Sequence, residues 1–103
     1  MAYSLYYYDV VKIDLIEAKK WYKKHQPGLE IRFAAEVKDC FKRLQNNPLN
    51  YEIKYKNVRT AFTAIFPYAI HFYLDDAKQL IVIIGIIHQS RNPDLSYNRD
   101  NDE

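Results

Sequence analysis

The apolar positions of residues 10–46 recur with the period of an α-helix, in two stretches separated by Pro27 and Gly28. The stripe of the first stretch comprises Val11, Leu15, Ala18 and Tyr22. The stripe of the second comprises Phe33, Val37, Cys40, Phe41 and Leu44. These spacings predict helices over residues 10–25 and 29–46, with Asp9 as the N-cap of the first and Asn46-Asn47-Pro48 ending the second. Because the link is so short, we expect the helices to pack as an antiparallel hairpin.

After Pro48 the period changes from 3.6 to 2, which is typical of β-strands. Apolar and charged residues alternate over 51–55, and a plausible turn follows at Lys56-Asn57. Further strands are predicted over 58–66 and 68–74, with Val58, Thr60, Phe62, Ala64 and Phe66 on one face of the former. Residues 80–87 are apolar on both faces, as in a central strand that is covered on both sides. The aromatic-rich residues 3–8 suit a short first strand.

The order of these elements predicts one α+β domain, written β-α-α-β-β-β, with the helical hairpin packed on one face of a mostly antiparallel sheet. We expect a four-stranded sheet with residues 80–87 at its centre. Residues 1–95 are assigned to this domain. Residues 96–103 form a polar tail, which we expect to be poorly ordered because it is too polar to bury a core.

The length of 103 residues fits a single domain, and 49% apolar with 27% charged residues is typical of a soluble globule. No stretch approaches the roughly 18 consecutive apolar residues that a membrane span requires. The first residues contain no basic leader, apolar region or cleavage signal, so we expect a cytoplasmic location and no contact with a membrane. The single cysteine, Cys40, excludes an internal disulfide and a zinc ribbon.

The net charge is only +2, but the charges are distributed unevenly. Residues 10–46 hold nine basic and five acidic groups, whereas residues 76–103 hold three basic and five acidic groups. A net charge this small does not by itself indicate nucleic-acid binding. The distribution predicts a basic helical hairpin and an acidic C-terminal region.

Several kinds of site are disfavoured by the residues present. Two glycines, one in a turn and one in a strand, cannot form a phosphate-binding loop, so no nucleotide cofactor is expected. The three histidines have neither a helical i, i+4 partner nor a cysteine partner, so no metal is expected. Cys40 lies on the apolar stripe of its helix, where a core role is more plausible than a catalytic thiolate.

One group of polar residues remains as a candidate site: Arg59, His88, Arg91 and Tyr97. Together they would suit a phosphodiester, because a guanidinium stabilises developing negative charge while an imidazole or a phenol transfers protons. The alternative is that both arginines form structural salt bridges and His88 ends its strand. Among the ten tyrosines, Tyr6 and Tyr8 are the best candidates to face a partner, because they lie on the strand face opposite Leu5 and Tyr7.

Three segments resemble the RelE/ParE superfamily of bacterial type II toxins, in this order: WYKKHQPGLEIRFAAEV, LQNNPLNYEIKYKNVRTAFTAIFPYAIHFY and IIGIIHQSRNPD. The resemblance covers roughly residues 5 to 95, and its fold agrees with the order of elements predicted from periodicity. It implies a toxin, with a link to plasmid stabilisation, that a cognate antitoxin wraps and silences. Either a homo-oligomer or a toxin-antitoxin hetero-oligomer is compatible with it.

The superfamily contains ribosome-dependent mRNA endonucleases of the RelE type and gyrase poisons of the ParE type. The nuclease branch typically carries two lysines and an arginine at places that here correspond to Thr60, Phe62 and Ala69. This difference favours a ParE-like toxin, as do the FPYAI and H-x-x-R-x-P segments. Such a toxin is expected to bind DNA gyrase and need not be an enzyme. We expect Arg59, His88 and Arg91 to contact the gyrase. The alternatives are a RelE-like endonuclease acting on mRNA at the ribosome and an inactive homologue kept as a binding partner.

Overall fold

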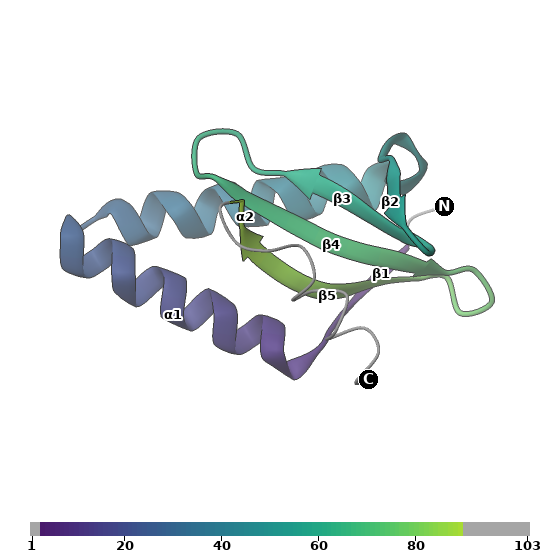
Figure 1. The fold of residues 1–103 in the computed structure, drawn as a ribbon, viewed down its shortest axis with the longest axis horizontal. Helices are drawn as coiled ribbons and strands as arrows, with labels where there is room; N and C mark the ends of the chain where they lie inside the picture. Colours follow the sequence, from purple (N-terminus) through teal and green to yellow (C-terminus); the bar gives the residue numbers. More distant parts are fainter. Residues whose placement is uncertain (1–2, 90–103) are drawn as a thin grey trace.

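The computed structural model describes residues 3–89, which form two helices against a five-stranded sheet (Figure 1). The chain order is β1 (Ser4–Tyr7), α1 (Asp9–His25), α2 (Leu29–Asn46), a short 3-10 turn (Pro48–Asn50), β2 (Ile53–Tyr55), β3 (Val58–Phe62), β4 (Tyr68–Asp75) and β5 (Leu80–His88). The strands are arranged β1-β5-β4-β3-β2. Among residues 3–89 only the β1–β5 pair is parallel, so the predicted α+β class and mostly antiparallel sheet are confirmed.

Both predicted helices are confirmed to within one residue at each end. The predicted N-cap of α1 is wrong: Tyr8 occupies that position and Asp9 is the first helical residue. The reason is that β1 continues its pairing up to the helix, since the Tyr8 amide donates to the carbonyl of Ile83 at 3.1 Å. Between the helices Gly28 takes a φ of +99°, a left-handed conformation that glycine adopts without a steric penalty.

The sheet has five strands rather than the four expected, because the three residues of β2 pair with β3 and form one edge. Strand β5 lies between β1 and β4, so it is an interior strand, but β4 is the middle one. All residues from Ile81 to Ile87 are nevertheless buried, as predicted for a strand covered on both faces.

Strand β3 ends at Phe62, four residues earlier than predicted. The Thr63 hydroxyl donates to the carbonyl of Phe66, and one carboxylate oxygen of Glu36 accepts the amides of Ile65 and Phe66 at 2.8 and 3.1 Å. These bonds satisfy the backbone of the loop without a partner strand. Phe66 therefore turns into the core instead of sharing a face with Phe62.

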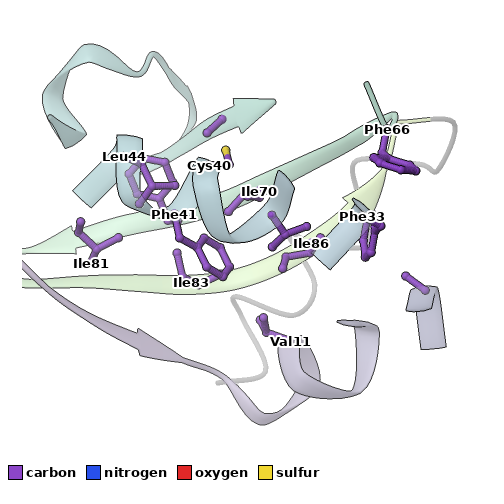
Figure 2. Close-up of a cluster of buried hydrophobic side chains, with 14 of the residues drawn as sticks. Val11, Phe33, Cys40, Phe41, Leu44, Phe66, Ile70, Ile81, Ile83 and Ile86 are labelled. Atoms are coloured by element: carbon purple, nitrogen blue, oxygen red, sulfur yellow. The ribbon is translucent and has the colours of Figure 1, made fainter. Parts of the chain in front are cut away.

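The main core lies between the helices and one face of the sheet (Figure 2). Helix α1 contributes Val11, Ala18 and Tyr22, and α2 contributes the whole predicted stripe. Sheet residues that face them are Ala61, Ile70, Phe72, Ile81, Ile83 and Ile86. A second, smaller cluster of Val58, Val82 and Ile84 lies on the other face of the sheet, which we call the open face. No helix in the described range is long and apolar enough to cross a membrane.

Candidate functional site: a cavity on the open face of the sheet

A cavity of about 300 Å³ lies on the open face, over strands β3, β4 and β5. The pairing of the strands explains which residues line it. Thr60 pairs with His71, which in turn pairs with Gly85, while Phe62 pairs with Ala69 and Ala69 with Ile87. Since paired residues share a face, these two rows of side chains lie next to each other on the open face.

The register of β4 and β5 shifts beside His71. The partner of His71 is Gly85 but the partner of Phe72 is Ile83, so Ile84 is an extra residue on β5. A bulge of this kind bends the strand, and it keeps His71 on the open face while Phe72 stays in the main core.

The polar groups of the cavity are two histidines, a tyrosine, a threonine and a lysine. His71 is buried, and its Nδ1 lies 3.4 Å from the hydroxyl of Tyr55 at the end of β2. The Thr60 hydroxyl is also buried, and among the described residues it has no hydrogen-bond partner. The Lys54 ammonium lies 2.8 Å from the Glu52 carboxylate, an exposed ion pair that leaves Lys54 partly neutralised.

His88 ends β5 and lies between two cavities. It lines the cavity on the open face, and it also lines a larger one of about 540 Å³ between α1 and the end of the sheet. Its ring meets the ring of Tyr68, its partner in β4, edge to face at 5.2 Å. His88 therefore lies at a strand end and lines hollows on both sides of it.

Arg59 does not join His88. It pairs with Phe72, a residue of the main core, and its guanidinium donates to the carbonyl of Tyr51 at 2.6 Å. The hydrogen bond ties the loop before β2 to β3, so Arg59 has a structural contact on the helix side of the sheet. Arg91 and Tyr97, the other members of the predicted group, lie outside the described residues.

The two tyrosines expected at an interface differ in environment. Tyr6 on the edge strand β1 is 55% exposed, whereas Tyr8 is half-buried and packs against both hydrophobic clusters. Tyr6 alone of the two presents most of its ring to solvent.

Cys40 is completely buried, and burial raises the pKa of its thiol, so the thiolate is disfavoured. Among residues 3–89 no group of three or more histidine, cysteine or acidic side chains is placed to hold a metal ion. What the open-face cavity offers chemically is a phenol and two imidazoles, all of which can donate and accept hydrogen bonds.

The sequence analysis did not identify Tyr55 and His71 as members of a candidate site or as neighbours of each other. The alternation of residues 68–74 does place Ala69, His71 and Tyr73 on the face opposite Ile70 and Phe72. That signal assigns His71 to a face, but its neighbours depend on strand order and register, which alternation alone does not give.

Comparisons with known proteins agree with this architecture. The family described as the ParE toxin of the type II toxin-antitoxin system parDE matches residues 8–93. This range includes every described helix and most of the sheet. The chain therefore belongs to the ParE toxin family of type II toxin-antitoxin systems. No curated protein sequence matched the chain.

Solved structures that share the fold include the following three. A chain of the chromosomal ParDE system of P. aeruginosa superposes with a TM-score of 0.74 at 19% identity, covering 84% of this chain and 96% of that one. The RelBE2 toxin-antitoxin complex of Mycobacterium tuberculosis gives 0.59 at 21% identity, with 85% and 99% covered. The isolated RelE toxin of E. coli gives 0.63 at 12% identity, with 99% and 100% covered. The predicted resemblance to the RelE/ParE superfamily is confirmed.

Proposed function

We propose that this toxin acts by binding DNA gyrase rather than by cutting RNA, and that a cognate antitoxin neutralises it. The observation that carries the proposal is the charge of the open-face cavity. Thr60, Phe62 and Ala69, which correspond to the cationic positions of the nuclease branch, all line this cavity and are all neutral. Cleaving a phosphodiester develops negative charge, and the loss of one positioned donor typically costs about 3–4 kcal/mol of transition-state stabilisation.

The remaining cations of this region do not replace those groups. Arg59 lies on the other side of the sheet and donates to the Tyr51 carbonyl. Lys54 lines the cavity but pairs with Glu52. The cavity instead presents the apolar side chains Phe62, Ala69 and Ile87 beside polar rings. Such a surface is better suited to contact with a protein than to stabilising the negative charge that develops when a phosphodiester is cleaved.

One observation favours the endonuclease alternative. The Tyr55 hydroxyl and the His71 imidazole lie together in the same cavity as His88, and such groups can serve as general base and acid. An RNase of this kind would use histidine and tyrosine in place of lysine and arginine. An inactive homologue retained as a binding partner is the third candidate.

The antitoxin proposal is supported by the family and by the neighbours, since the ParDE and RelBE2 structures are of toxin-antitoxin systems. Several large apolar side chains are exposed here, including Ile13, Ile16, Trp21 and Ile31 on the two helices. Two of them, Ile16 and Ile31, line one groove between the helices, and apolar groups gathered in this way are typical of an interaction site.

The deciding experiment compares two activities of the purified toxin: inhibition of supercoiling by gyrase, and cleavage of mRNA in the ribosomal A site. We expect inhibition of gyrase and weak or no cleavage. Arg91→Ala should weaken binding to gyrase, whereas Arg32→Ala, a change of the same type on the exposed face of α2, should leave it unchanged.

Robust mRNA cleavage that falls by about 10²-fold or more in His71→Ala or His88→Ala would contradict the proposal, because a loss of that size is typical of a catalytic acid or base. The endonuclease alternative would then stand. Absence of both activities, in protein that folds and binds its antitoxin, would instead favour the inactive homologue.

A further inference from the structure

The Thr60 hydroxyl in the open-face cavity makes the isolated chain less stable. The side chain is 7% exposed, and its Oγ1 has no hydrogen-bond partner among residues 3–89. A buried hydroxyl without a partner loses the hydrogen bonds that it makes with water in the unfolded chain. Valine has the same shape without the hydroxyl, so it would stabilise the fold better at this position. Folding therefore gives no reason for a hydroxyl here, whereas a ligand that bonds to Oγ1 does.

The polar neighbours of Thr60 do not satisfy its hydroxyl. The cross-strand partner of Thr60 is His71, which is also buried. The Nδ1 atom of His71 lies 3.4 Å from the hydroxyl of Tyr55 instead. All three residues line the cavity, and we call them the polar row. A ligand that enters the cavity can therefore meet several hydrogen-bonding groups at once.

An apolar row lies next to the polar row. It consists of Phe62, Ala69 and Ile87, which follow one another across β3, β4 and β5. Phe62 is 51% exposed although it lines the cavity, so a ligand that covers its ring removes apolar surface from water. Aromatic rings also attract one another in edge-to-face or offset contacts. The two rows together suit a ligand that combines an apolar ring with a polar group.

The size and charge of the cavity narrow the choice of ligand. Its volume is about 300 Å³, and an apolar cavity of about 150 Å³ already admits benzene. Among the described residues that line it, none is acidic, and its one lysine, Lys54, is paired with Glu52 at 2.8 Å. A neutral ligand with a single substituted ring is therefore favoured over a charged one.

We infer that this cavity takes a tyrosine side chain of the protein target, with its ring against Phe62 and Ala69 and its hydroxyl bonded to Thr60 Oγ1. The inference deepens the proposed function, in which that target is gyrase. A phenol both donates and accepts, so it can bond to Thr60 and to a second group of the polar row, whereas an indole only donates. Tyrosines seated in pockets are frequent anchors of protein interfaces. An RNA base would bring a phosphate, which gains little from the paired Lys54.

The test compares two small probes on the full-length toxin. One is p-cresol, which is the tyrosine side chain, and the other is toluene, which lacks the hydroxyl. Titrations followed by NMR should shift the signals of Thr60, Phe62, Ala69 and Ile87, and p-cresol should bind about fivefold or more tightly than toluene. Thr60→Val should abolish this preference and leave the affinity for toluene within about twofold. The matched variant Thr60→Ser keeps the hydroxyl and should keep the preference.

A stability measurement separates a binding role of the hydroxyl from a structural one. Thr60→Val should unfold at the same or a higher denaturant concentration than the wild type, because it removes a buried unpaired hydroxyl. A clear loss of stability would show that the hydroxyl serves the fold, and it would overturn the inference. Equal affinity for p-cresol and toluene, or no binding of p-cresol up to about 10 mM, would also overturn it. Tighter binding of adenosine or uridine monophosphate than of p-cresol would overturn it in favour of the endonuclease alternative.

The same variants connect the cavity to the target. Inhibition of gyrase should weaken by about fivefold or more in Thr60→Val and less in Thr60→Ser. Equal inhibition by the wild type and Thr60→Val would overturn the inference and leave the proposed function intact. If p-cresol binds as expected but the wild type does not inhibit gyrase, the proposed function fails, and the tyrosine site belongs to contact with another protein.

Discussion

At the scale of single residues, Tyr22 connects α1 to three other parts of the domain. Its ring lies 5.1 Å from that of Phe33 on α2, 4.9 Å from that of Phe66 in the β3–β4 loop and 6.3 Å from that of Tyr68 on β4. Burial, followed by the neighbouring Tyr68 and Glu36, raises the pKa of Tyr22 from 10.0 to about 12. The hydroxyl at this junction is therefore held neutral.

This shift predicts a particular dependence of stability on pH. Between pH 10 and about pH 12 the unfolded chain releases the Tyr22 proton while the folded protein keeps it, so the free energy of unfolding falls as the pH rises. Tyr22→Phe keeps the ring and removes this proton. Its free energy of unfolding, measured by chemical denaturation at a series of pH values, should fall less steeply above pH 10 than that of the wild type. Parallel curves for the two proteins would contradict the assignment.

At the scale of elements, β5 holds the sheet and the helices together. It pairs with β1 on one side and β4 on the other, and it supplies Ile81, Ile83 and Ile86 to the main core and Val82 and Ile84 to the open-face cluster. Strand β2, by contrast, has three residues and lies at an edge. An element buried on both faces opens only when the whole domain unfolds.

Hydrogen exchange provides the test. The amides of residues 81–87 should exchange with the free energy of global unfolding, and those of β2 should exchange much faster through local opening. The amides of α1 on its exposed side serve as an internal reference for helix fraying. If residues 81–87 ranked among the least protected strand amides, β5 would not be the organising strand.

At the scale of the whole molecule, the predicted partner links binding to folding. A partner that binds only the folded toxin adds about 2.7 kcal/mol to its free energy of unfolding when present at about 100 times its Kd. For a domain of this size we expect the melting temperature to rise by roughly 10 °C with the product of the neighbouring reading frame. Co-expression of the two should also relieve toxicity.

The control is an unrelated acidic protein of similar size at the same concentration, which should leave the melting temperature unchanged. If the two products neither associate nor shift the melting temperature, the antitoxin proposal is wrong. Because this readout does not involve gyrase or mRNA, it tests the partner separately from the target.

The sequence alone determined the elements whose cause is local. The stripe from Phe33 to Leu44 and the Pro27-Gly28 break define α2 and the hairpin, and the continuous apolar run of residues 80–87 identifies an interior strand. Three segments spread along residues 21–94 carried the resemblance to the toxin superfamily, which the family match confirms. Hydrophobic periodicity depends only on the residues within one segment, so it can be recognised without knowledge of the fold.

Tertiary structure decided what depends on residues far apart in the chain. The end of β3 at Phe62 depends on Glu36, which binds the loop from another element. Strand order and a one-residue bulge in β5 decide which polar residues meet. They separate Arg59 from His88, and they bring His71 next to Tyr55. A single-residue change of register moves a side chain to the opposite face of a sheet, and only the pairing of distant strands fixes that register.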